Sequence, residues 1–141
     1  MSLQAVLAPL FVQVALTFVL MFWTGAARTA AIRRREVKVR DIALGQQAWP
    51  ERETQIGNCY RNQFELPVLF YVLTVLAIIA RKADLLFVLM AWVFVVLRIV
   101  HAAIHTGSNY VPRRFYAFLA GAIVLLLMWI IFAVRVLLGL G

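Results

Sequence analysis

The chain has 141 residues, of which 65% are hydrophobic and 14% are charged, and its mean hydropathy is +0.91. This composition excludes a soluble globular protein and predicts an integral membrane protein. The formal net charge is +8, but the most basic segment, RRREVKVR at 33–40, has no interleaved aromatic residues that could stack on bases. Contact with anionic lipid headgroups explains the charge better than nucleic-acid binding, so we expect no nucleic-acid partner.

Four apolar runs follow one another along the chain, at residues 3–27, 64–80, 85–107 and 115–138. With its flanking helical residues, each run approaches the roughly 20 residues that cross about 30 Å of hydrocarbon. The first run is longer than the core of a signal peptide and no Lys or Arg precedes it, so we interpret it as a retained helix. The sequence predicts a single all-α domain over 1–141, a bundle of four transmembrane helices in the lipid bilayer.

Basic residues gather on one side of these runs. The first and third connections or their borders hold Arg28, Arg33, Arg34, Arg35, Lys38, Arg40, Arg52, Arg113 and Arg114, whereas the other side holds Arg81, Lys82 and Arg135. By the positive-inside rule, the first and third loops face the cytoplasm and both termini face away from it. The compact chain is typical of a protein of the bacterial inner membrane.

The first two connections contain signals for helix boundaries. In AWPERET, Pro50 followed by two glutamates predicts that the second helix begins near 51–55. Pro67 removes one backbone donor and predicts a bend in this helix, which is otherwise expected to be continuous. The connection ARKAD is so short that the helices on either side of it must be antiparallel neighbours.

The third connection, TGSNYVPRR, carries its own boundary residues. Gly107 predicts the end of the third helix, and Ser108 or Asn109 is a possible cap for the fourth. Pro112 is expected in or just before the first turn of that last helix.

Polar residues recur in two of the predicted helices at offsets of three, four and seven, which places each set on one helix face. The sets are Asn58, Arg61 or Asn62, and Glu65 in the second helix, and Arg98, His101 and His105 in the third. An ionisable side chain in hydrocarbon costs several kcal/mol, so such stripes face the protein interior and often mark a functional site.

Glu65 and Arg98 are predicted to lie at the same depth in the membrane. Each is about ten residues, or roughly 15 Å, from the cytoplasmic end of its helix, so we expect a buried ion pair between them. The pair is compatible both with a structural clamp and with the wall of a pocket. Arg28 closes the first helix and Arg114 opens the fourth at this membrane face, which predicts a cytoplasm-facing pocket for an anion.

A cation at a helix N-terminus opposes the helix dipole, so Arg114 should have a negative partner. We favour a binding role for Arg114 over a headgroup contact, whereas Arg113 is expected only to set topology. No metal site is predicted, because His101 and His105 lack a third ligand in the membrane and Cys59 is the single cysteine. Interhelical hydrogen bonding is the favoured role of the two histidines.

The segments RNQFELP in the second helix, RIVHAAIH in the third and VPRRF at the start of the fourth, with TGAAR ending the first, resemble motifs of one membrane family. In order and helix position they are similar to the membrane-associated proteins in eicosanoid and glutathione metabolism, the MAPEG superfamily. The resemblance covers nearly the whole chain. It implies a homotrimer of four-helix protomers that binds glutathione between neighbouring protomers in the cytoplasmic half of the membrane.

The resemblance also implies which residues contact glutathione. Carried over by position, they are Arg28, Arg61, Asn62, Glu65, His101 and Arg114. In this interpretation arginines pair with the carboxylates of glutathione and Glu65 holds its amine. Arg114 or Arg28 is the catalytic group that stabilises the thiolate, because a free thiol with a pKa of about 8.5 is mostly unreactive at neutral pH. Arg98 and His105, from the stripe on the third helix, are predicted to complete the cofactor site.

The chain departs from the family pattern at four places. Asn58 stands where many members have an arginine, and His105 where they have a tyrosine. Phe115 and Phe118 fall where some relatives have hydroxyl side chains.

The first hypothesis for function is a glutathione-dependent transferase or peroxidase that acts on hydrophobic electrophiles. The alternative is a non-catalytic protein that keeps the family scaffold and binds a lipid or another amphiphilic anion. A small transporter or a haem protein is disfavoured, because no discontinuous helix or inverted repeat is expected and both histidines lie on one helix.

Overall fold

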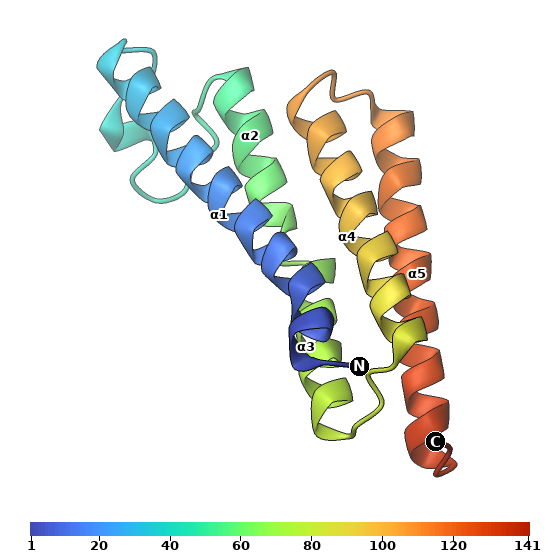
Figure 1. Cartoon of the computed structure of the whole chain (residues 1–141). Helices are drawn as coiled ribbons and strands as arrows, with labels where there is room; N and C mark the ends of the chain where they lie inside the picture. Colours follow the sequence, from blue (N-terminus) through green and yellow to red (C-terminus); the bar gives the residue numbers. More distant parts are fainter.

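The computed structural model describes residues 1–141 and is built from helices alone (Figure 1). The elements are α1 (Leu3–Arg33), the short 3-10 helix η1 (Val39–Asp41), α2 (Glu51–Asn62), α3 (Leu66–Ile79), α4 (Leu85–Thr106) and α5 (Val111–Leu137). Four stretches are long and apolar enough to cross a membrane: α1, α2 with α3, α4, and α5. The predicted all-α bundle of four transmembrane helices is confirmed.

Several predicted helix boundaries are confirmed. Pro50 directly precedes α2, whose first turn contains two glutamates near the positive end of the helix dipole. Gly107 ends α4, and Pro112 lies in the first turn of α5, where its missing N–H group is not needed.

The second transmembrane span is broken, so the prediction that it is continuous was wrong. α2 ends at Asn62 and α3 begins at Leu66, with Gln63, Phe64 and Glu65 outside both helices. Pro67 lies in the first turn of α3 and cannot donate a backbone hydrogen bond. The chain therefore starts a new helix one residue before this proline instead of bending through it.

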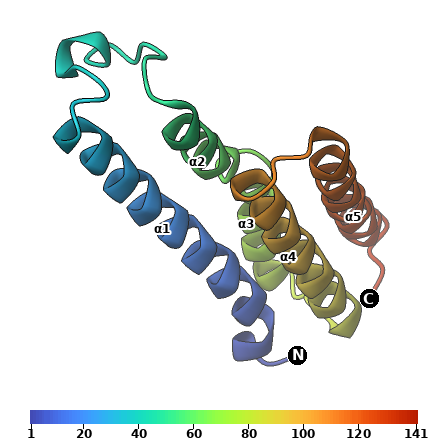
Figure 2. The same ribbon diagram turned by 90° about the horizontal axis from the view of Figure 1, so that it is seen from above.

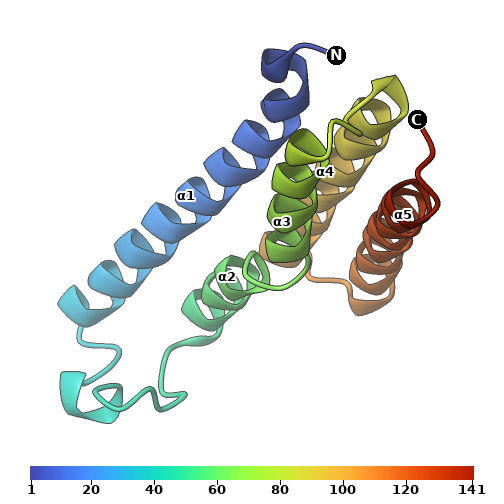
Figure 3. The ribbon, with the colours of Figure 1, turned by 90° about the horizontal axis from the view of Figure 1, so that it is seen from below.

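The hydrophobic core lies in the half of the bundle that holds the termini. Phe70 of α3 packs against Phe94 of α4 with ring centroids 4.8 Å apart, and both side chains are fully buried. Val6 of α1 and Leu125 of α5 close the core from either side. Figures 2 and 3 show the resulting order, with α3 and α4 in the middle and with α1 and α5 on opposite flanks.

Large apolar side chains cover much of the outer surface, including Phe22 and Ile79, which are 69% and 72% exposed. In water such a surface would be unfavourable, but hydrocarbon solvates it and requires only that backbone polar groups be paired within the helices. The chain is an integral membrane protein.

The two ends of the bundle differ. Both termini and the connection at 80–84 lie at one end, and the connections at 34–50 and 107–110 lie at the other (Figure 1). We call the second one the basic end, because it holds the nine arginine and lysine residues assigned above to the first and third connections. As the predicted topology requires, both termini lie at the end opposite the first and third connections. That the basic end faces the cytoplasm stays a prediction.

At the termini end, an ion pair joins the start of α4 to the end of α5. Asp84 caps α4 by accepting a hydrogen bond of 3.0 Å from the N–H of Phe87, and it accepts one of 2.7 Å from Arg135. Burial alone would raise the pKa of Asp84, but these two hydrogen bonds together hold it below its ordinary value.

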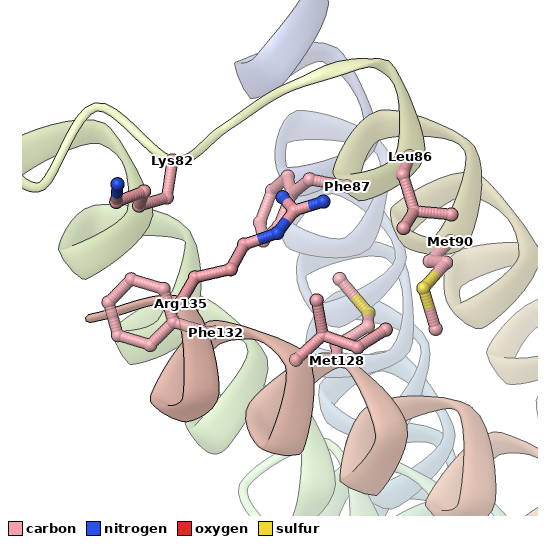
Figure 4. Close-up of a pocket in the computed structure, with 8 residues that line it drawn as sticks. Lys82, Leu86, Phe87, Met90, Met128, Phe132 and Arg135 are labelled. Atoms are coloured by element: carbon pink, nitrogen blue, oxygen red, sulfur yellow. The ribbon is translucent and has the colours of Figure 1, made fainter. Parts of the chain in front are cut away.

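Arg135 also lies beside a narrow apolar pocket between α4 and α5 (Figure 4). The pocket offers an accessible volume of only about 20 Å³, which is room for little more than one water molecule. It is therefore part of the packing between the two helices and not a ligand site.

We predict that Asp84→Ala lowers the free energy of unfolding by about 1 kcal/mol, because the helix cap is lost. Asp84→Asn is the matched control, since Asn caps a helix equally well and loses only the partly exposed ion pair. Because the pKa of Asp84 is depressed in the folded protein, wild type should have a higher free energy of unfolding than Asp84→Asn at neutral pH. This difference should disappear as the pH falls below about 4. Denaturant unfolding in detergent measures both effects, and equal stability of Asp84→Ala and wild type would contradict them.

Candidate functional site

A pocket of about 440 Å³ opens between α2, α4 and α5 toward the basic end. We call it the polar pocket. Its walls are Asn58, Arg61, Asn62, Glu65, His101, His105, Val111, Arg114, Phe115 and Phe118. Six of the eight predicted site residues meet here, and the two exceptions are Arg28 and Arg98.

The break between α2 and α3 gives the polar pocket its acidic group. Glu65 immediately precedes α3, and Asn62 Nδ2 donates a hydrogen bond of 3.0 Å to Glu65 Oε2. The side chain of Glu65 is exposed at the protomer surface. The amide of Asn62 therefore orients the carboxylate in an otherwise open position.

Arg98 lies behind this wall and does not line the pocket. It is 1% exposed, and its Nη2 donates to Oδ1 of Asn62 and, at 3.5 Å, to the backbone carbonyl of the same residue. The predicted ion pair with Glu65 is not formed, because Asn62 stands between the two charges and contacts both. Arg98 thus acts on the pocket through Asn62 and serves as the clamp between α4 and α2.

Sequence reasoning missed the residues that hold the helix break itself. Gln13 of α1 is fully buried and its Nε2 donates a hydrogen bond of 2.9 Å to Oε1 of Gln63, and Gln63 Nε2 donates one of 3.0 Å to the carbonyl of Cys59. The signal available in the sequence was a glutamine inside the first apolar run, since polar side chains in a membrane helix usually find an interhelical partner.

Two further residues of α2 fix the end of α4. Gln55 Nε2 donates hydrogen bonds of 2.8 and 2.9 Å to the carbonyls of His105 and Gly107, and Arg52 donates to the carbonyl of Thr106. The last carbonyls of a helix have no partner within it, so these side chains satisfy them. The contacts hold His105 against the pocket and were not predicted.

The two histidines meet edge to face in the pocket wall. Their ring centroids are 5.5 Å apart, and His101 also lies 5.8 Å from Phe118. The Nδ1 atom of each ring is buried without a hydrogen-bond partner, so the expected interhelical hydrogen bonds are not made at these atoms. No third His, Cys, Asp or Glu joins them as a possible metal ligand.

Arg114 reaches the pocket from the first turn of α5. Its Nη1 donates a hydrogen bond of 2.8 Å to Oδ1 of Asn109. The sequence suggested Ser108 or Asn109 as a helix cap, but the residue before α5 is Tyr110 and no side chain caps this helix. Arg113 points elsewhere and lies over the ring of Tyr110 at 5.7 Å.

Arg28 belongs to a second, smaller cavity of about 160 Å³ under the first connection. We call it the loop pocket. It is lined by Arg28, Ile42, Gly45, Gln46, Gln47, Trp49, Thr54, Asn58 and Arg61. Asn58 and Arg61 line both cavities, so Arg28 and Arg114 lie on opposite sides of this shared wall. The prediction that both arginines meet in one pocket is wrong within a single protomer.

The charges of the polar pocket suit an anionic ligand that also carries an amine. Arg61 and Arg114 provide two cations, and Glu65 provides one carboxylate. The edge formed by Val111, Phe115 and Phe118 is apolar and belongs to the helix on the flank of the bundle. A ligand bound at this edge can therefore contact the charged residues of the pocket and an apolar surface at the same time.

The fold and site together define a class, the four-helix integral membrane proteins with a cationic pocket at one end of the bundle. Residues 6–134 match the MAPEG family, and the chain belongs to that family. The resemblance drawn from the sequence motifs is confirmed. Comparison with the curated proteins and with the solved structures gives no match.

We predict that Asn62→Ala lowers the free energy of unfolding by about 3 kcal/mol, because it removes the side-chain acceptor of the buried charge of Arg98 and leaves only the backbone carbonyl of residue 62. Asn58→Ala, one turn earlier on the same helix, is the control and should cost far less. The double variant Asn62→Leu with Arg98→Met should recover much of the loss, since apolar residues can replace a buried polar pair. Denaturant unfolding in detergent measures the stability of all three variants. A small loss of stability in Asn62→Ala would contradict the role of Arg98 and Asn62 as a clamp between α4 and α2.

Proposed function

We propose that the protein is a membrane-embedded, glutathione-dependent transferase or peroxidase that acts on hydrophobic electrophiles. The observation that supports this most strongly is the meeting of Glu65, Arg61 and Arg114 in one pocket of a MAPEG family member. The volume of about 440 Å³ falls within the usual range of small-molecule sites, about 300–1,000 Å³.

Each charged group has a distinct task in this proposal. Glu65, oriented by Asn62, binds the ammonium group of glutathione, and Arg61 pairs with a carboxylate. A guanidinium donates two parallel hydrogen bonds to a carboxylate, which fixes the orientation of the ligand. His101 and His105 offer polar ring atoms from the facing wall, and Asn58 offers its amide.

Arg114 is the proposed catalytic residue. Bound glutathione would supply a thiolate for either reaction: its sulfur would bond to an electrophilic carbon while the leaving group departs with the bonding electron pair, or two glutathiones would together reduce the O–O bond of a hydroperoxide, giving an alcohol, water and glutathione disulfide. Arg114 favours the anionic form of the sulfur by its charge. Phe115 and Phe118 provide the apolar surface on which the electrophile lies, at the edge of the pocket.

The protomer alone leaves the site open, which supports a homotrimer. Arg61 and Glu65 are exposed at the protomer surface, and a charged group that faces hydrocarbon costs several kcal/mol. A neighbouring protomer would cover them, and its α1 could bring a second Arg28 to the ligand. We propose that the basic end of this trimer faces the cytoplasm of a bacterial inner membrane.

Multi-angle light scattering of the protein in detergent tests the assembly. We expect a protein mass three times that of the 16.0 kDa chain. A stable monomer that still binds glutathione would contradict the covered site.

We predict that Arg114→Gln lowers kcat by about a hundredfold, because it removes a group that stabilises charge at the reacting atom. Arg113→Gln, the neighbouring arginine on the same turn, lies over Tyr110 outside the pocket and should keep wild-type kcat. Steady-state kinetics with glutathione and an electrophilic aromatic substrate measure this. Equal effects of the two variants would contradict the assignment.

A second candidate has its own supporting observation. The α5 side of the pocket offers Val111, Phe115 and Phe118 and no hydroxyl group, which favours a protein that binds an amphiphilic anion without catalysis. Calorimetric titration separates the candidates. Millimolar glutathione should bind wild type and should bind Glu65→Gln more weakly, whereas no binding to either protein would favour the second candidate.

A further inference from the structure

A groove at the termini end, between the start of α1 and the end of α3, shares no residue with the polar pocket or the loop pocket. We call it the terminal groove. Its volume is about 300 Å³, and six of its seven lining side chains are apolar. Its floor is closed, since Val6 is 3% exposed and Ala77 is fully buried. The seventh lining residue is the exposed Arg81, which adds one cation to an apolar groove.

The backbone fixes the place of Arg81 beside the terminal groove. The N–H of Lys82 donates a hydrogen bond of 2.9 Å to the carbonyl of Ala77, and the N–H of Arg81 donates one of 3.2 Å to the carbonyl of Ile78. This pair of bonds is the Schellman motif that ends many helices. Arg81 occupies its left-handed position with a φ of 57°, where glycine is usual because it has no Cβ. Glycine at this position would therefore suit the fold, and the arginine needs another reason to be there.

Arg81 is the basic side chain at the termini end that no contact within the protein uses. Of the other two, Arg135 pairs with Asp84 and Lys82 donates to the carbonyl of Leu140. No ion pair includes Arg81, and no acidic residue lines the terminal groove. Its charge is therefore free to attract an anion at the edge of an apolar surface.

We propose that the terminal groove binds an anionic phospholipid, with the phosphate on Arg81 and an acyl chain between α1 and α3. A guanidinium donates parallel hydrogen bonds to two phosphate oxygens, and Leu3, Val6, Ala77 and Ile78 provide the apolar walls. Hydrocarbon chains surround the whole bundle, so any acyl chain can fill the groove. The charge of Arg81 is what selects an anionic lipid over a zwitterionic one. The proposal does not depend on glutathione use.

Amide hydrogen exchange of the connection at 80–84 tests this site, in nanodiscs of phosphatidylcholine with and without phosphatidylglycerol. A local readout is needed, because the arginines and lysines of the basic end also attract anionic lipids. We expect phosphatidylglycerol to slow exchange at 80–84 in wild type. In Arg81→Gly, which should fold because glycine suits the backbone, half-maximal protection should need about fivefold more phosphatidylglycerol, the effect of one basic residue near an anionic membrane surface.

Two further variants separate the groove from a general attraction of charges. Lys82→Gln removes the neighbouring basic side chain, which does not line the terminal groove, and should keep the protection of wild type. Ala83→Leu leaves every charge in place but takes up part of the groove, and should weaken the protection. Each variant is compared with itself in the two kinds of nanodisc, so that a change in its intrinsic exchange rate cancels.

Three results would overturn the proposal. The first is exchange at 80–84 that is equally slow in both kinds of nanodisc, since another copy of the chain would then cover the groove. The second is Arg81→Gly or Ala83→Leu with the full protection of wild type. The third is an equal loss of protection in Lys82→Gln and Arg81→Gly. A protein that fails to bind glutathione leaves all these outcomes unchanged.

Discussion

The contact between Arg98 and Asn62 is the constraint on which the site depends. A guanidinium that is 1% exposed within a transmembrane span needs acceptors, and Asn62 supplies both its side-chain oxygen and its backbone carbonyl. That carbonyl lies at the last residue of α2, and it also accepts a backbone hydrogen bond of 3.2 Å from the N–H of Glu65 across the break. The break in the span thus provides acceptors for Nη2 of the buried cation, whose Nε and Nη1 have no hydrogen-bond partner, and through the amide of Asn62 it orients Glu65.

The break also separates the bundle into two parts with different properties. Toward the termini, the aromatic pair Phe70 and Phe94 anchors a core in which buried side chains are almost all apolar. Toward the basic end, the hydrogen bond between Gln13 and Gln63 begins a layer in which polar side chains are buried. Stability therefore comes mainly from one half of the bundle, and the other half is free to hold charged side chains at a ligand site.

Sequence reasoning predicted the spans and most of the pocket for a simple reason. Hydropathy is a local property, and residues at offsets of three and four share a helix face, so Arg61, Glu65 and His101 could be assigned to one site. The bridging role of Asn62 could not be predicted, because spacing does not specify the rotation of one helix against another. The position of Arg28 depends on the path of the first connection, and the full break before Pro67 depends on tertiary partners such as Gln13.

Amide hydrogen exchange of the purified protein, with and without glutathione, tests the central claim that the polar pocket is the ligand site. The segments at 63–65 and 107–110 are outside regular helix and border this pocket, so their amides can report on it. We expect glutathione to slow exchange in both segments and to leave the connection at 80–84 unchanged. No protection at either segment, or protection confined to 80–84, would contradict the account.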